Sequence, residues 1–179
     1  MIVSWKIFSF YENFKQKGQI KNLENKMKNK RKIKYFHQTT DYTCGPASIK
    51  MALSFFEIFK SEKQLAGILR TDSKKGTRIN DFISGAKFLG FDYVIKTSSK
   101  VKDLRMLQKK GYVVVVCYFI PEENLDHYSV LKKVGLKNIY FFDPWFGEDH
   151  KYSINYFKRI WKCDERFDKE KAWCIALKK

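Results

Sequence analysis

Apolar side chains recur at helical spacing in the stretch that follows Pro46. Their spacing of four, four, three and one places them on one face of a helix. Pro46 suits the first turn of such a helix, because the N–H that proline lacks would have no intrahelical partner there. The expected buried positions are Ala47, Met51, Phe55, Ile58 and Phe59.

Three further helices are expected in the same half of the chain. Ser61-Glu62-Lys63-Gln64 has the form of a capping box, which opens a short helix. Residues 77–89 carry apolar positions at helical spacing, and Gly90 ends that helix. Residues 102–110 predict a fourth helix.

After Gly111 the pattern changes to that of strands. Residues 112–119 are β-branched and apolar on both sides, which is typical of a central strand. Residues 127–134 and 138–143 flank Gly135-Leu136-Lys137 and predict a hairpin. The other expected elements are a strand over 91–96, a short helix over 153–161 and a last strand over 172–177. This order predicts an α+β fold with N-terminal helices packed on an antiparallel β-sheet.

The length of 179 residues suits one domain with a tail, and a hydrophobic fraction of 44% argues against global disorder. Residues 1–34 carry ten Lys and Arg against two acids, and we interpret them as a basic, aromatic-tipped N-terminal arm. Residues 35–179 would then form the folded domain. The most apolar run, Val113–Ile120, has the length of a strand, so no transmembrane segment is expected.

The formal net charge of +17 invites a nucleic-acid or anionic-membrane partner. No helix-turn-helix, zinc-finger or RNP motif accompanies it, so we favour a solvated lysine-rich surface over nucleic-acid binding. A weak association of the arm with an anionic membrane stays open. The four cysteines show no CxxC pair, which predicts a reducing, cytoplasmic compartment without disulfides; no cofactor is expected.

A cysteine, Cys44, stands directly before Gly45 and Pro46 at the start of the first predicted helix. The helix macrodipole and the unpaired backbone N–H groups at that end favour thiolate over thiol. Gln38, six residues upstream, brings a side-chain amide close to the same point. A thiolate with hydrogen-bond donors nearby suits acyl transfer through a covalent thioester. The sequence therefore predicts Cys44 as a nucleophile.

Three histidines could serve as its base: His37 beside the glutamine, His150 in an expected polar loop, and His127 at the start of a strand. Active-site residues favour such strand ends, where a rigid element presents the side chain, and this favours His127. The predicted hairpin also places Asp143 opposite Ser129, on the face that His127 shares. A carboxylate there can hold one imidazole nitrogen while the other faces the thiol.

Each of these residues has a plainer interpretation when taken alone. A histidine at a strand start is commonly a surface residue, and an aspartate before proline commonly forms a turn. A zinc site made by the catalytic candidates has no ligand pair at the spacing of known zinc motifs, and no metal is predicted. The remaining cysteines are interpreted as small buried apolar residues: Cys117, Cys163 and Cys174. The occurrence of all four residues in the order Gln, Cys, His, Asp is what favours a catalytic role.

Several short motifs are shared with a known family. They are Gln38 with Cys44-Gly45-Pro46-Ala47, Thr71 with Gly76-Thr77 before a helix, His127-Tyr128, and Asp143-Pro144. Over about residues 35–161 the chain resembles the bacteriocin-processing, double-glycine leader peptidases of cysteine-peptidase family thirty-nine. The resemblance implies a papain-like fold with Cys44 as nucleophile, His127 as base and Asp143 orienting the base. It also implies that Gln38 and the backbone N–H of Cys44 donate to the oxyanion.

The function that this resemblance implies is hydrolysis of a bond in a peptide or protein substrate, with leader processing as one option. The best-known members are N-terminal domains of export ABC transporters, and this sequence shows neither membrane spans nor a nucleotide-binding domain. Substrate choice therefore does not carry over. Two alternatives stay open: acyl or amide transfer by the same triad, and a catalytically silent peptide-binding module.

Overall fold

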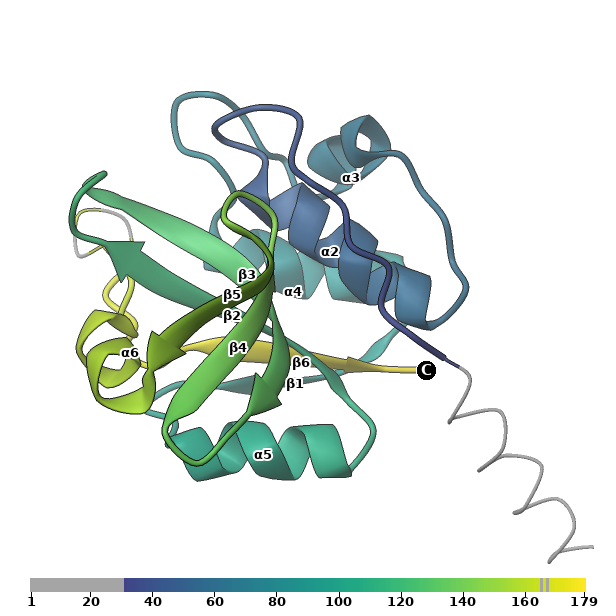
Figure 1. Ribbon diagram of the computed structural model, residues 1–179. Helices are drawn as coiled ribbons and strands as arrows, with labels where there is room; N and C mark the ends of the chain where they lie inside the picture. Colours follow the sequence, from purple (N-terminus) through teal and green to yellow (C-terminus); the bar gives the residue numbers. More distant parts are fainter. Residues whose placement is uncertain (1–30, 165, 167) are drawn as a thin grey trace, which may run out of the picture. The chain divides into compact units, whose positions relative to one another are not determined.

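The computed structural model describes residues 31–164, 166 and 168–179 (Figure 1). Residues 33–179 form one compact unit. The expected N-terminal arm, residues 1–34, lies outside the described residues except for its end, so it stays a prediction. Among the helices of the described part, none has the length and apolar character that a membrane crossing requires.

Five helices of the described part correspond to sequence patterns. They are α2 (Cys44–Phe55), α3 (Glu62–Ile68), α4 (Ile79–Phe88), α5 (Val101–Lys109) and α6 (Ile154–Ile160). The capping box predicted for α3 is confirmed, because Ser61 Oγ accepts from the Gln64 N–H at 3.2 Å and the Gln64 side chain accepts from the Ser61 N–H at 2.9 Å. Local sequence therefore determines where this helix begins.

The first helix is shorter than its apolar pattern predicted. Ala47 and Met51 are buried as expected, but α2 ends at Phe55. Glu57 adopts the left-handed conformation at φ 60°, which breaks the helical path. Phe59 consequently lies beyond the helix and is 62% exposed, so its assignment to the buried face was wrong.

The strands form one antiparallel sheet in the order β1-β6-β2-β3-β4-β5. The strand bounds are β1 (Asp92–Lys96), β2 (Val113–Ile120), β3 (Leu125–Val134), β4 (Asn138–Asp143), β5 (Gly147–Ser153) and β6 (Cys174–Lys178). The prediction of a central strand is confirmed by β2, which pairs on both sides and is buried almost throughout. The α+β class and the antiparallel sheet are confirmed as well.

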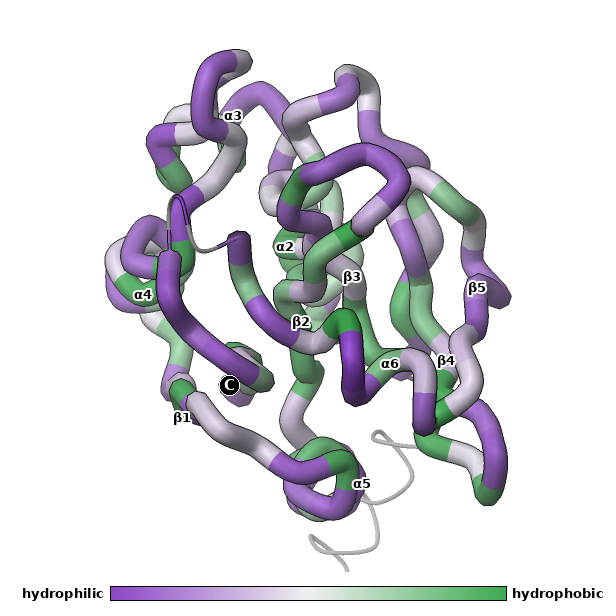
Figure 2. Tube along the Cα trace, turned by 90° about the vertical axis from the view of Figure 1, so that its left-hand side faces the viewer, coloured by the Kyte–Doolittle hydropathy of each residue, from purple (hydrophilic) through white to green (hydrophobic). Residues whose placement is uncertain are grey.

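Two apolar layers cover the sheet. One face packs against α2 and α4 through residues such as Met51 and Phe82, and the other against α5 and α6 through Leu104 and Phe157. Figure 1 shows α2, α3 and α4 on one side of the sheet and α5 on the other. Figure 2 shows apolar residues along β2 and β3, which lie between these layers. The helix that begins at Cys44 is therefore held by a continuous core.

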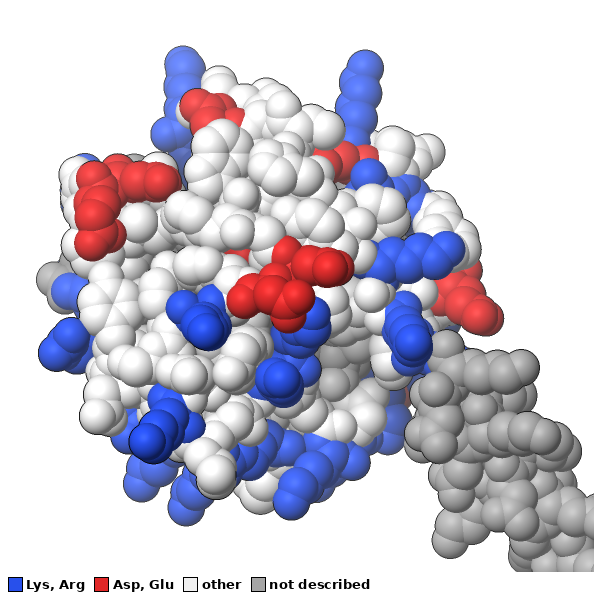
Figure 3. All heavy atoms as spheres, in the orientation of Figure 1, with Lys and Arg blue, Asp and Glu red and all other residues white. Residues whose placement is uncertain are grey.

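The surface of α5 is basic. It exposes Lys102, Arg105 and Lys109, and Figure 3 shows Lys and Arg side chains gathered at this lower edge of the molecule. Because α5 and α2 lie on opposite faces of the sheet, this basic surface is separate from the helix that carries Cys44.

The β3–β4 hairpin has a bulge that the sequence did not predict. Near the loop, Val134 pairs with Ile139 rather than Asn138, so the predicted register is wrong there by one residue. The register then shifts in the middle of β3, and Val130 pairs with Phe142 as predicted. A bulge adds one residue to one strand and so shifts the pairing by one. Beyond this bulge, the same side chains share a face as in the predicted hairpin. The end of the hairpin that carries the predicted carboxylate keeps the predicted register.

The segment around His150 is a strand rather than the predicted polar loop. Residues Gly147–Ser153 form β5 and pair with β4 at the edge of the sheet. An edge strand is paired on one side only, and charged residues are common there, so Glu148 and Asp149 are compatible with it. Polar composition alone therefore misassigned this segment.

Candidate active site

Cys44 is the first residue of α2, and its side chain is 6% exposed. Thr43 precedes it with non-helical backbone angles, as the N-cap of the helix. The helix is tied to the neighbouring strand because the Ser48 hydroxyl donates to the Tyr128 carbonyl at 2.9 Å. The sulfur thus lies at the N-terminus of a helix that is fixed to the strand carrying His127.

His127 and Asp143 meet across the β3–β4 hairpin. His127 Nε2 lies 2.9 Å from Asp143 Oδ1, and the two residues are 4% and 0% exposed. The Cys44 side chain lies close enough to the same imidazole to favour its charged form. Because Nε2 faces the carboxylate, Nδ1 is the nitrogen left for the sulfur. The structure therefore brings Cys44, His127 and Asp143 together in the order that the sequence predicted.

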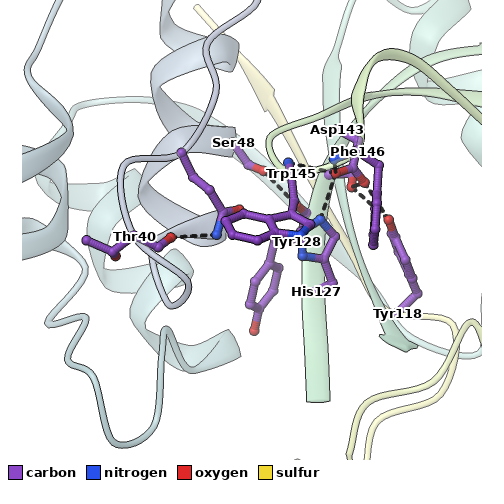
Figure 4. A network of polar contacts seen from close by, with 10 residues as sticks. Thr40, Ser48, Tyr118, His127, Tyr128, Asp143, Trp145 and Phe146 are labelled. Atoms are coloured by element: carbon purple, nitrogen blue, oxygen red, sulfur yellow. Dashed lines mark hydrogen bonds and ion pairs between the residues drawn. The ribbon is translucent and has the colours of Figure 1, made fainter. Parts of the chain in front are cut away.

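Asp143 is held by more donors than the histidine alone. Its Oδ1 also accepts from the backbone N–H groups of Trp145 and Phe146, at 2.9 and 2.8 Å. Its Oδ2 accepts from Tyr118 Oη and Ser129 Oγ, both at 2.5 Å. Figure 4 shows the carboxylate between the Tyr118 hydroxyl and the His127 ring. Both oxygens are saturated, so the carboxylate has a fixed orientation.

Sequence reasoning did not assign Tyr118 and Ser129 to this network. For Ser129 a signal existed, since the predicted hairpin register already placed it opposite Asp143. Tyr118 comes from β2, and its pairing with His127 is set by the β2–β3 register. Nothing in the local sequence around Tyr118 shows that its hydroxyl reaches a carboxylate on β4.

The charges of His127 and Asp143 stabilise each other. Burial disfavours a charged His127, but the adjacent Asp143 and the hydrogen bonds to Asp143 and Cys44 outweigh this effect and raise the pKa of His127 to about 10. Burial likewise disfavours a charged Asp143, yet the His127 imidazolium and the donors around the carboxylate hold its pKa well below the usual range. At neutral pH the two groups form a buried ion pair.

Aromatic rings cover the imidazole. The Phe146 ring lies 5.7 Å from that of His127 and stacks on His150 at 4.9 Å. The Trp145 ring lies 5.6 Å from that of His37. His37 and His150, the two alternative bases, therefore contact these aromatic rings, and neither takes the place of His127 beside Asp143. A low-dielectric cover strengthens the hydrogen bonds beneath it.

Gln38 lies in a loop tied to the end of the hairpin. Its backbone N–H donates to the Pro144 carbonyl at 2.9 Å, and its side chain is buried. Nε2 donates to the Thr40 carbonyl at 2.6 Å. An amide nitrogen carries two hydrogens, so a second N–H stays available for another acceptor. Glu62 supports the loop, because its Oε1 accepts from Thr39 N and Oγ1 at 2.9 and 2.7 Å.

A cleft of about 220 Å³ opens beside Cys44. Gly76 and Thr77 form one wall, where Gly76 adopts a left-handed φ of 61° and the Thr77 hydroxyl bonds to that of Thr71 at 2.6 Å. Leu125, at the start of β3, lies on the same cleft. Its charged lining residues are Asp41, Lys74, Lys75, Arg78, Asp126 and Asp168. Both signs of charge are present, so the cleft is not selective for one sign.

Gly45 allows the helix to approach the cleft wall closely. A Cβ at this position would collide with the Thr77 side chain and lie 3.2 Å from the Phe82 ring. We expect Gly45→Ala to displace Cys44 and to lower the melting temperature. Overpacking of this kind lowers the free energy of unfolding by about 1–3 kcal/mol. Gly67→Ala is the matched control, because its Cβ would meet nothing within 4 Å and alanine favours the helix. Equal melting temperatures for the two variants would contradict this close packing.

Comparison with known proteins agrees with this geometry. The model of the Peptidase C39 family matches residues 32–164. Among solved structures, the peptidase domain of Streptococcus ComA, a bifunctional ABC transporter involved in quorum sensing, has a TM-score of 0.64 at 19% identity, over 82% of this chain and 98% of that one. A C39-like peptidase from Bacillus anthracis has a TM-score of 0.61 at 16% identity, over 84% of this chain and 96% of that one.

A third structure contains a bound peptide. It is a double glycine motif protease from an AMS/PCAT transporter in complex with the leader peptide, with a TM-score of 0.60 at 19% identity, over 83% of this chain and 94% of that one. Among curated protein sequences none matches significantly. The solved structures support the papain-like peptidase fold.

Proposed function

This chain belongs to the Peptidase C39 family and is a cysteine-type peptidase, and from that premise we propose that Cys44, His127 and Asp143 are its catalytic triad. The observation that carries the proposal is that the Cys44 side chain lies beside the His127 imidazole, which is itself held by the Asp143 carboxylate, at the edge of a cleft. The buried Asp143 keeps the imidazole oriented and favours its charged form.

The reaction follows from these positions. The Cys44 thiolate attacks the peptide carbonyl carbon, and the carbonyl oxygen becomes an oxyanion. His127 gives its proton to the leaving amine, which departs and leaves a thioester on Cys44. His127 then takes a proton from water, the water oxygen attacks the thioester, and the carbon–sulfur bond breaks. The Cys44 thiolate is thereby regenerated beside the protonated His127, and the acid product leaves as a carboxylate after losing its proton to solvent. The buried ion pair with Asp143 stabilises the imidazolium between these transfers.

Gln38 is the side-chain donor to the oxyanion in this proposal. Because its Nε2 is already held by Thr40, the second N–H is fixed in direction. We expect Gln38→Ala to lower kcat by about 10²–10³ with little change in KM. The matched control is Gln108→Ala, which removes an amide that bonds to Leu131 and Lys132 instead. Steady-state kinetics on one fluorogenic peptide would measure both, and equal kcat values would contradict this role.

For the substrate we propose a leader-type peptide cleaved after a Gly-Gly pair. Support comes from the family and from the similar protease whose structure holds a leader peptide. The test is mass spectrometry of products from the full chain with two synthetic peptides, one containing Gly-Gly and one Ala-Ala at the same place. Cleavage of both would contradict the leader specificity, and cleavage of neither would contradict the substrate class.

The same experiment separates hydrolysis from acyl transfer. Hydrolysis leaves a free carboxylate on the N-terminal product, whereas transfer to an added amine leaves an amide. We expect the carboxylate product in the presence of a small primary amine. An amide as the dominant product would favour the transferase alternative over the peptidase.

A further inference from the structure

A second cluster of reactive side chains lies outside the triad. It comprises Cys117 on β2, Asp126 on β3 and Cys163 just after α6. The two sulfurs and a carboxylate oxygen all lie within 4.8 Å of one another. Both cysteines are almost fully buried, at 0% and 1% exposure, and both are free thiols.

Contacts with neighbouring groups hold the three side chains of this cluster in place. The Cys117 and Cys163 thiols lie close enough to interact. Asp126 Oδ1 accepts from the backbone N–H of Asp164 at 2.6 Å, which fixes the carboxylate beside the thiols and leaves Oδ2 for another partner. Three side chains that can each offer a metal ligand are thus held together by the fold.

We propose that Cys117, Cys163 and Asp126 bind a zinc ion. Two thiolate sulfurs select a thiophilic d¹⁰ ion over calcium or magnesium, which prefer oxygen ligands. Around tetrahedral zinc, with Zn–S and Zn–O distances of about 2.3 and 2.1 Å, the sulfur and oxygen ligand atoms lie roughly 3.6–3.8 Å apart. The observed spacing is within about an ångström of this arrangement, so small side-chain movements are sufficient.

The ion would enter through the substrate cleft. Asp126 lines that cleft and is half-buried, whereas the two sulfurs lie deeper. Three protein ligands leave the fourth position for a water molecule from the cleft. Binding would exchange the protons of the thiols and the carboxyl group for the metal, without any change in oxidation state. The site would clamp the start of β3 to the segment after α6.

This site is distinct from the triad and was not visible in the sequence. Cys117 and Cys163 are far apart in sequence, and only the fold places them side by side. The sequence predicts both as small buried apolar residues, and their burial is confirmed. Asp126 adjoins His127 in sequence, but the side chains of neighbouring residues in a strand point to opposite faces of the sheet.

The test measures zinc binding in a chain that lacks the catalytic thiol. Cys44→Ala removes the sulfur of the triad, so zinc bound to that variant cannot be held by Cys44. We expect the full chain with this change, freed of metal and titrated with zinc sulfate, to bind one ion and to melt at a higher temperature with zinc. With cobalt(II) in place of zinc, a sulfur-to-metal charge-transfer band should report thiolate ligation.

Two added changes assign the ligands. Cys163→Ser and Asp126→Asn should each abolish stoichiometric binding or weaken it at least about tenfold. Cys174→Ser is the matched control, because Cys174 is equally buried but lies outside the cluster, and it should keep the site. Asp126→Asn retains the shape of the side chain, so it tests the ligand even if Cys163→Ser fails to fold.

Absence of zinc binding in the Cys44→Ala chain would overturn the proposal. Binding that persists unchanged in both Cys163→Ser and Asp126→Asn would overturn it as well. Neither result bears on peptide cleavage, so the metal site and the proposed peptidase mechanism can fail independently.

Discussion

Replacing Cys44 by alanine should remove all detectable peptide cleavage while the fold stays intact. The thiol is the only protein nucleophile in the proposed reaction, and no thioester can form without it. The side chain is small, and its loss at the start of α2 leaves intact the Ser48–Tyr128 hydrogen bond that ties this helix to β3. We therefore expect a cooperative melting transition close to that of the wild type.

Cleavage would be followed by liquid chromatography, and folding by circular dichroism. Cys174→Ala is the control, since it removes an equally buried thiol from β6, away from the triad. It should keep the activity of the wild type. Measurable turnover in Cys44→Ala would refute the nucleophile assignment.

Replacing Asp143 should produce the next largest effect, and the choice of substitute separates charge from orientation. Asparagine can keep its oxygen toward His127 and the two backbone N–H groups, because the Tyr118 and Ser129 hydroxyls can turn to accept from its NH₂. Asp143→Asn should thus fold but lose the negative charge that favours the imidazolium. We expect kcat/KM to fall by about 10²–10⁴.

Asp143→Ala should also destabilise the fold. It leaves the donors around the carboxylate without a partner and removes one member of a buried ion pair. Breaking such a pair costs about 3–5 kcal/mol of unfolding free energy. Urea denaturation of the wild type and the two variants would measure this cost. Equal stability of Asp143→Ala and the wild type would contradict the saturated network.

The stability difference between the wild type and Asp143→Asn should depend on pH. The pKa of Asp143 is lowered on folding, so its contribution is present above its unfolded value of 3.8 and is lost as pH falls through the depressed folded value. The pKa of His127 is raised, so its contribution is complete below 6.5 and is lost as pH rises toward about 10. The difference should be largest between about pH 4 and 6.5.

The sequence was sufficient for the residues that local patterns position. Cys44 at a helix start and the capping box at Ser61 follow from short-range rules. The face shared by His127 and Asp143 was predicted from hairpin pairing, although the loop-end register was wrong. The predicted register is nevertheless correct at the end that carries Asp143, because a bulge in β3 shifts the pairing by one residue. No local sequence pattern predicts this bulge.

Contacts between distant segments could not be predicted in this way. The Tyr118 hydroxyl reaches Asp143 across two strand pairings. The cluster of Cys117, Asp126 and Cys163 depends on where the chain returns after α6. Such proximities arise from tertiary packing, which neither spacing nor composition encodes.

The most direct test of the account is the reactivity of the four cysteines toward iodoacetamide as a function of pH, read by peptide mass spectrometry. If the Cys44 thiolate is stabilised by the His127 imidazolium, Cys44 should be alkylated much faster than the other three cysteines at neutral and lower pH, and His127→Ala should abolish this preference. Cys117, Cys163 and Cys174 should stay unmodified because they are buried and, unlike Cys44, do not line the cleft. Equal alkylation of all four cysteines, or a rate at Cys44 that is unchanged in His127→Ala, would contradict the proposed triad.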